Sequence, residues 1–149
     1  MSNYQDGEYK TPYGRIHVHN PGSLHVPENL RTYKRSVGNV VLQEPALGSF
    51  KEAEVAATPR RMRRKGKVLP ILLTGVGYRS YAYQKSLYQS EPGRFANPDG
   101  SMHVEALAID IDMRQSWLRR QRIAYHLKKR GWYYAVPGEP WHASFGLPG

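Results

Sequence analysis

Two short stretches of the chain carry side chains that ligate metals and move protons. In SMHVEALAID, residues 101–110, His103 and Asp110 stand seven positions apart within an apolar run. In GEPWH, residues 138–142, Glu139 and His142 stand three positions apart. A hydrolytic zinc site needs three such ligands, an open position for water and a base beside that water. The two stretches can supply this set, with His142 on the metal and Glu139 on the water.

The spacing of His103 and Asp110 constrains the backbone between them. An odd separation places two side chains on opposite faces of a regular strand. The two residues can converge only if the chain turns or bulges at residues 104–106. Pro140 disfavours a helical backbone at Glu139, so we expect a turn or a strand entrance there. Each stretch alone is a weak signal, because an isolated His and Asp are more often structural.

The elements that must position these residues mix helix and strand without regular alternation. Apolar periodicity predicts helices at residues 45–57, 81–89 and 116–129, the last capped by Ser116 and stopped by Gly131. It predicts strands at residues 15–19, 68–73, 107–113 and 132–135. In the third of these strands, Ala108, Asp110 and Asp112 share one face. We give Asp112 a solvated position on that face. This order of elements favours an α+β fold over a doubly wound one.

The composition bounds the chemistry. A chain of 149 residues, 40% of them hydrophobic, suits one domain with its own core. There is no cysteine, so any metal must be held by His and carboxylate side chains. The sequence has no apolar run near the about 20 residues that span a bilayer. The start, MSNYQDGEYKTPYGR, has no apolar signal region, so we expect synthesis in the cytoplasm without a signal peptide.

The net charge of +10, from 22 basic and 12 acidic residues, predicts attraction to polyanions. The run PRRMRRKGK at residues 59–67 holds six of the basic residues. No nucleic-acid motif accompanies this run and no aromatic residues interleave it, so nucleic acid is not the expected partner. We expect a solvated loop or contact with anionic wall polymers or a membrane surface.

The motifs resemble one known family. Ser101-Met-His103-Val-Glu-Ala106-Leu-Ala108-Ile-Asp110 is similar to a Ser-x-His-x-x-Gly-x-Ala-x-Asp pattern, Glu139-Pro-Trp141-His142 to Glu-x-Trp-His, and Gly77-Tyr78-Arg79-Ser80 to an upstream Gly-Tyr-Arg-Ser segment. These are the motifs of the zinc peptidases of the D-alanyl-D-alanine carboxypeptidase and L-alanyl-D-glutamate peptidase family, which includes the vancomycin-resistance D,D-peptidases and many phage endolysins. The resemblance covers about residues 41–149 as a catalytic core. Residues 1–40 are expected to be an irregular N-terminal extension packed on the same domain.

The resemblance implies a fold and a set of roles. The fold would be a small single α+β domain, with a central antiparallel sheet flanked by helices and the zinc site in a cleft. One zinc ion per chain would lie on His103, Asp110 and His142, with Glu139 as catalytic base. Arg79 would bind the substrate and stabilise the oxyanion, a task that suits a permanent charge with forked donors. Further substrate contacts are assigned to Ser101, Gln84 and Trp141, although each also has an ordinary structural explanation.

The function that follows is a zinc-dependent peptidoglycan peptidase of the phage endolysin type, a monomer that acts on the bacterial cell wall after release. Zinc-bound water, activated by Glu139, would attack a peptide bond of the stem peptide. The first alternative is a bacterial D-Ala-D-Ala carboxypeptidase or dipeptidase. The second is of another class, a basic polyanion-binding protein whose zinc is structural.

Two features need inspection in the fold. Ala106 occupies the position where the family usually has Gly, and a positive φ there would impose a steric cost on Ala. His17 and His19 alternate with apolar residues and would face one side of a strand, as a metal-binding pair can. We favour a structural role for this pair, because no acid or third His follows at a useful spacing.

Overall fold

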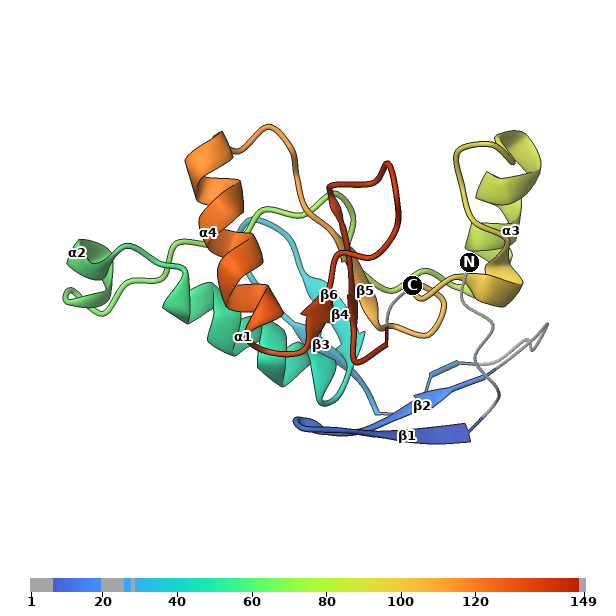
Figure 1. Cartoon of the computed structure of the whole chain (residues 1–149), viewed down its shortest axis with the longest axis horizontal. Coiled ribbons are helices and arrows are strands. Elements are labelled where there is room, and N and C mark those ends of the chain that lie inside the picture. Colours follow the sequence, from blue (N-terminus) through green and yellow to red (C-terminus); the bar gives the residue numbers. More distant parts are fainter. Residues whose placement is uncertain (1–6, 20–25, 28, 148–149) are drawn as a thin grey trace.

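The computed structural model describes residues 7–19, 26–27 and 29–147, and Figure 1 shows their arrangement. Mixed helices and antiparallel strands form a single small domain, as predicted. The elements, in chain order, are β1 (Gly7–Thr11), β2 (Gly14–Val18), β3 (Leu30–Tyr33), β4 (Val40–Gln43), α1 (Ala46–Ala56), α2 (Arg60–Arg63), α3 (Tyr81–Ser90), the 3-10 turn η1 (Pro98–Gly100), β5 (Ala108–Asp110), α4 (Trp117–Lys128), β6 (Trp132–Tyr133) and β7 (His142–Phe145). No helix in the described ranges is long and apolar enough to cross a membrane.

The described strands form three small antiparallel sheets. β1 pairs with β2, β3 pairs with β4, and the third sheet has the order β5-β7-β6. Single bridges join Val41 to Gly77 and Leu73 to Ile111. The bridge at Val41 ties the second sheet to the segment that precedes Arg79.

The helices at residues 45–57 and 116–129 are confirmed as α1 and α4, which pack together along one side of the strands (Figure 1). Phe50 and Leu47 of α1 and Ile123 and Leu127 of α4 are buried in the common core. Ser116 caps α4 through its side chain, which accepts a hydrogen bond from the Arg119 amide, as predicted. The predicted helix at residues 81–89 is confirmed as α3, which lies at the far end of the molecule from α2 (Figure 1).

The predicted strand at residues 68–73 is wrong except at Leu73, which forms a bridge to Ile111. Between Leu69 and Ile71, side chains and not a neighbouring strand satisfy the backbone, whereas the Leu72 carbonyl accepts from the Asp112 amide at 2.9 Å. Thr58 Oγ1 accepts from the Leu69 amide at 2.9 Å and Glu54 Oε2 from the Ile71 amide at 3.0 Å. Arg119 donates to the Leu69 carbonyl at 2.8 Å. An apolar run of strand length therefore lacks a ladder because charged and polar side chains already occupy its hydrogen-bonding groups.

The N-terminal part contains more regular structure than its composition indicates. The predicted strand at residues 15–19 is found as β2, and it forms a hairpin with β1 in which Gly7 faces Val18 and Thr11 faces Gly14. β3, also before residue 40, pairs with β4 after it. Within the stretch expected to be irregular, residues 1–6, 20–25 and 28 lie outside the described residues. The division of the chain at residue 40 stays a prediction.

Candidate metal centre

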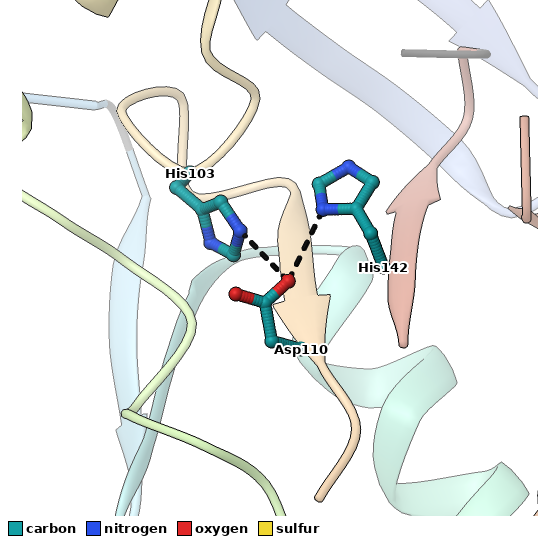
Figure 2. A group of neighbouring side chains, drawn as sticks. All are labelled: His103, Asp110 and His142. Carbon is teal, nitrogen blue, oxygen red and sulfur yellow. Dashed lines mark hydrogen bonds and ion pairs between the residues drawn. The ribbon is translucent and has the colours of Figure 1, made fainter. Parts of the chain in front are cut away.

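A compact turn lies between His103 and Asp110, as their odd spacing predicts. The Val104 amide donates to the Ser101 carbonyl at 3.2 Å and the Ala106 amide to the His103 carbonyl at 3.1 Å. The turn reverses the direction of the His103 side chain relative to the strand that follows. Asp110 then ends β5, and both side chains point to the same place (Figure 2).

Ala106 has a left-handed backbone, with φ of +56°. Gln43, at the end of β4, holds this conformation from outside the turn. The backbone N–H of Gln43 donates to the Ala106 carbonyl at 3.0 Å, and the side-chain Nε2 of the same residue donates to the Glu105 carbonyl at 2.8 Å. Two fixed carbonyls leave the intervening residue little freedom, which offsets the steric cost of a Cβ at positive φ. Sequence reasoning did not find Gln43, because nothing in its neighbourhood marks a buried glutamine as a clamp.

Sheet pairing brings His142 to Asp110. β5 and β7 are antiparallel, and Asp110 lies directly opposite His142 in their register. Directly opposed residues in an antiparallel pair project from the same face with neighbouring Cβ atoms. The Ile111 amide extends the pairing with a 2.8 Å hydrogen bond to the Trp141 carbonyl. The distance between these two candidate ligands is therefore set by backbone hydrogen bonds.

The three predicted ligands converge on one carboxylate oxygen (Figure 2). His103 Nε2 and His142 Nδ1 each lie 3.2 Å from Asp110 Oδ1. One ligand atom from each of the three residues lies within 4.8 Å of the other two, and all three residues are buried. Ligands about 2.0–2.1 Å from a tetrahedral zinc ion stand roughly 3.3 Å apart, so the observed spacing fits such an ion.

The carbonyl of Gly77 fixes the orientation of the His103 ring. It lies 2.8 Å from Nδ1, and a carbonyl only accepts, so Nδ1 carries a proton and Nε2, which faces Asp110, is the nitrogen that can bind a metal. Gly77 reaches this position with φ of +97°, and a Cβ there would lie 3.1 Å from the Val41 carbonyl oxygen. A side chain at this residue would therefore both strain the backbone and crowd β4. Gly77 thus has a structural task.

Asp110 is held ionised. Burial raises the pKa of its carboxyl group, but hydrogen bonds and positive charge from His103 and His142 outweigh burial and keep the pKa well below its ordinary value. Arg79 contacts the other carboxylate oxygen, with NH2 3.0 Å from Oδ2. An ionised carboxylate with one oxygen toward two imidazoles is a ready ligand for a cation.

Arg79 is fixed at the edge of the cluster by Gln84. NH1 donates to Gln84 Oε1 at 3.1 Å, and Gln84 Nε2 donates to the Ala96 carbonyl at 2.8 Å. The Arg79 side chain is 20% exposed, whereas Gln84 is buried on α3. Gln84 therefore orients Arg79, and its contacts are those of a supporting residue. The assigned substrate contact of Gln84 and the oxyanion role of Arg79 stay predictions.

The remaining predicted residues lie near the ligands in sequence and differ in exposure. Glu139 is half-buried at the start of a turn, and its carbonyl accepts from the His142 amide at 3.1 Å. In the described part of the chain, no hydrogen bond or ion pair ties its carboxylate to the three ligands. Trp141 is 37% exposed beside His142, and Ser101 is buried at the start of the turn. Their roles as base and substrate contacts stay predictions.

The pair His17 and His19 has a different setting. Their rings lie 4.3 Å apart between centroids on the same side of β2 and the residue after it, as predicted. Glu105 Oε1 accepts from the His19 amide at 3.0 Å and lies 3.4 Å from His19 Nδ1. Glu105, which sequence reasoning missed, thus links the N-terminal hairpin to the turn that carries His103.

The comparisons with known proteins agree with this architecture. The sequence matches no family model and no curated protein. Its structure is similar to the LD-carboxypeptidase LdcB, with 22% identity and a TM-score of 0.56 over 85% of this chain and 69% of that one. It is similar to VanYB in complex with D-alanine-D-alanine, with 18% identity and a TM-score of 0.59 over 86% and 82%.

A third solved structure bears on the metal. A variant of the vancomycin-resistance D,D-pentapeptidase VanY in complex with Zn(II) matches with 18% identity and a TM-score of 0.56, over 86% of this chain and 84% of that one. These solved proteins belong to the group that the motifs resemble. The chain therefore has the fold of the D,D- and LD-carboxypeptidases, with a buried His-Asp-His cluster that can hold a metal ion.

Proposed function

We propose that this protein is a zinc-dependent peptidase that cleaves peptide bonds in the stem peptides of peptidoglycan. The observation that carries the proposal is the convergence of His103, Asp110 and His142 within 4.8 Å. The zinc complex of VanY and the D-alanine-D-alanine complex of VanYB support the metal and the substrate class.

The donor set fits zinc better than the harder divalent ions. Two imidazole nitrogens and one carboxylate oxygen form a set typical of catalytic zinc, whereas magnesium and calcium prefer oxygen ligands alone. The Gly77 carbonyl supports His103, and Arg79 supports Asp110 from the side away from the imidazoles. Such outer partners orient ligands and raise their affinity for the metal.

The residues divide the chemical work. Zinc, when bound, supplies a Lewis acid that polarises a carbonyl and lowers the pKa of water toward about 7. Glu139 takes a proton from the attacking water and returns it to the leaving amine. Arg79, with its guanidinium partly exposed beside Asp110, stabilises negative charge on the former carbonyl oxygen. Trp141 and Ser101 line the approach of the stem peptide.

Two finer forms of this activity have support. The net charge of +10 supports a phage endolysin, a monomeric endopeptidase made in the cytoplasm that acts on the wall after release. The three solved structures support a carboxypeptidase that removes the terminal D-amino acid. Mass spectrometry of digested peptidoglycan separates them. Internal cleavage of the stem supports the endolysin form, and release of terminal D-alanine alone contradicts it.

The decisive test of the activity is Glu139→Gln, which keeps the volume of the side chain and removes its basicity. We expect the variant to bind zinc with unchanged stoichiometry and to lose stem-peptide hydrolysis by about 100-fold or more, the scale of general base catalysis. Glu52→Gln, on the exposed face of α1, is the matched control and should retain activity.

One result would replace the proposal with a polyanion-binding protein that carries structural zinc. In that case the Glu139→Gln variant and the unaltered chain would be equally inactive on stem peptides, while removal of zinc by a chelator would lower the melting temperature. Steeply salt-dependent binding to DNA would add to that conclusion.

A further inference from the structure

Two segments of the chain are rich in basic residues and free of acidic ones. Residues 59–67 hold six basic side chains, and residues 116–131 hold another six together with His126. They form α2 with the loop after it, and α4 with its C-terminal turn. Acid-free segments of this length leave positive charge without local compensation.

The two segments meet in the fold. Arg119 of α4 donates to the Ala57 carbonyl at 2.7 Å and to the Leu69 carbonyl at 2.8 Å. These carbonyls flank the stretch that carries α2, so a single guanidinium fixes both of its ends to α4. Burial lowers the pKa of His126, and the charges of Arg130, Lys129, Arg122 and Arg63 lower it further. Positive charges from both segments thus lie close enough to act on the same side chain, His126.

The charges of this region are exposed and unneutralised. Seven exposed side chains define what we call the basic end: Arg60, Arg61, Arg64, Lys65, Lys67, Arg122 and Lys129. Across residues 7–19, 26–27 and 29–147, no ion pair joins any of them to a carboxylate. Five arginines elsewhere, namely Arg15, Arg35, Arg79, Arg94 and Arg114, each pair with an acid, whereas Arg31 bonds to the Leu30 carbonyl. The basic end is therefore available to an external anion.

The position of the basic end leaves the metal cluster accessible. α2 and α3 lie at opposite ends of the longest axis of the molecule (Figure 1). Arg79, at the cluster, immediately precedes the Ser80 cap of α3 and is bound by Gln84 on that helix. A polymer held along α2 would not need to cross the approach to Arg79.

We propose that the basic end binds the linear phosphodiester polymers of the bacterial wall, the chemistry of teichoic acids. This inference rests on the proposed function, because the same wall then holds both the polymer and the stem peptides that are cut. Arginine forks bind phosphate oxygens in a bidentate manner, and a flexible polymer can follow cations spread over α2 and α4. Binding at one end concentrates the cluster at its substrate.

Two other polyanions are alternative ligands of this surface. Stable binding to a lipid bilayer uses apolar side chains that enter the headgroup region. Residues 60–67 offer only half-buried Met62, but α4 exposes Trp117, Leu118 and Tyr125, so anionic vesicles are a direct competitor in the test. Duplex DNA is read by an element placed in a groove, whereas α2 is a four-residue turn of helix. A phosphodiester polymer needs only accessible cations.

The test measures binding of zinc-free chain to purified wall sacculi, before and after hydrofluoric acid removes their phosphodiester polymers. We compare R60Q/R61Q/R64Q with the matched control K10Q/R31Q/K34Q, which removes three exposed charges far from α2 in sequence. The first variant should bind intact sacculi at least tenfold more weakly in 50 mM salt, and the control within twofold of the unaltered chain. The dependence of log affinity on log salt should fall by about two, given about 0.7 per phosphate contact in flexible chains.

Three outcomes overturn the inference: equal binding to stripped sacculi, equal loss in both variants, or tighter binding to duplex DNA or phosphatidylglycerol vesicles than to intact sacculi. Hydrolysis of a soluble stem peptide by the unaltered, zinc-loaded chain is measured beside the binding. Hydrolysis without polymer binding overturns this inference and keeps the proposed function. Binding without hydrolysis keeps the polymer site and overturns the proposed function.

Discussion

Glu54 and Asp110 are buried carboxylates that each pair with an arginine, and they serve different ends. Glu54 of α1 accepts from Tyr33 Oη at 2.6 Å, from Arg35 NH1 at 2.6 Å and from the Ile71 amide at 3.0 Å. Every one of these partners is a fixed donor. Asp110 gives one oxygen to Arg79 and turns the other toward two imidazole nitrogens.

The two carboxylates differ in whether their hydrogen-bond partners can bind a metal ion. The donors on Glu54 satisfy an anion permanently, and burial together with the Glu54 charge raises the pKa of Tyr33 to about 12, so its proton stays in place. The nitrogens on Asp110 can release their protons and bind a cation instead. Glu54 therefore stabilises the fold, whereas Asp110 is arranged for a metal. Both carboxylates pair with an arginine, so the ion pair does not distinguish their roles. Their remaining hydrogen-bond partners do.

The largest expected effect comes from Asp110→Asn. Even residues that only support a metal ligand cost about 10–100-fold in affinity when replaced, so loss of a ligand should exceed 100-fold and abolish hydrolysis. Zinc titration by calorimetry measures the affinity. The zinc-free variant should also lose some stability relative to the zinc-free parent, because the lowered pKa of Asp110 stabilises the fold at neutral pH. Zinc affinity is therefore compared on folded protein, and an unchanged affinity would show that Asp110 is not a ligand.

Glu54→Gln should act on stability and leave the metal centre intact. Removing one partner of a buried ion pair costs about 3–5 kcal/mol, because Arg35 stays buried without its counter-charge. Urea denaturation gives the free energy of unfolding, and zinc stoichiometry is measured on the folded fraction. Glu52→Gln, two residues earlier and exposed, is the control, expected within about 0.5 kcal/mol of the parent.

The turn that presents His103 to Asp110 can be tested at Ala106. Ala106→Val adds a β-branched side chain at positive φ, whereas Ala108→Val adds the same volume on extended β5, where both alanines are fully buried. Overpacking costs about 1–3 kcal/mol at either position. The excess loss in the first variant measures the added cost of β-branching at positive φ, because the parent alanine already has a Cβ there. Equal losses would show that the left-handed backbone imposes no constraint on the turn.

Elements that depend on local signals could be predicted from the sequence, whereas contacts between distant residues could not. Helix periodicity and the Ser116 cap are local signals, and they located α1, α3 and α4. The His103, Asp110 and His142 set was recognisable because its residue types and gaps are specific. The supporting roles of Gln43 and Glu54 were not recognisable, because these residues bond to carbonyls and amides distant in sequence. The segment at residues 68–73 misled for the same reason, since its backbone is satisfied by Arg119, Thr58 and Glu54 instead of by a strand.

The smallest expected effect concerns a third pair, Asp112 with Arg114, whose arginine side chain is 91% exposed. The predicted solvated position of Asp112 is wrong, because the residue lies beyond the end of β5 and is buried. Hydrogen bonds from Arg114 lower the pKa of Asp112 to about 2. A carboxyl group whose pKa is lowered on folding adds stability above its unfolded pKa and loses it as the pH falls toward the folded value. Asp112→Asn should therefore unfold slightly more easily at pH 7.

This difference should shrink between pH 4 and pH 2, as measured by urea denaturation at each pH. A gap that persists at pH 2 would mean that Asp112 contributes through something other than its charge. The variant also serves as the control for Asp110→Asn, because it lies two residues away on the chain and should keep full zinc affinity.

The pairing of Asp110 with His142 across β5 and β7 makes the metal centre depend on the strand register reached during folding. Side chains alternate along a strand, so a slip of one residue would send His142 to the opposite face and separate it from Asp110. A mispaired sheet could then be compact and yet bind no metal. Zinc binding therefore distinguishes correctly paired molecules from mispaired ones, since only the correct strand register places His142 beside Asp110.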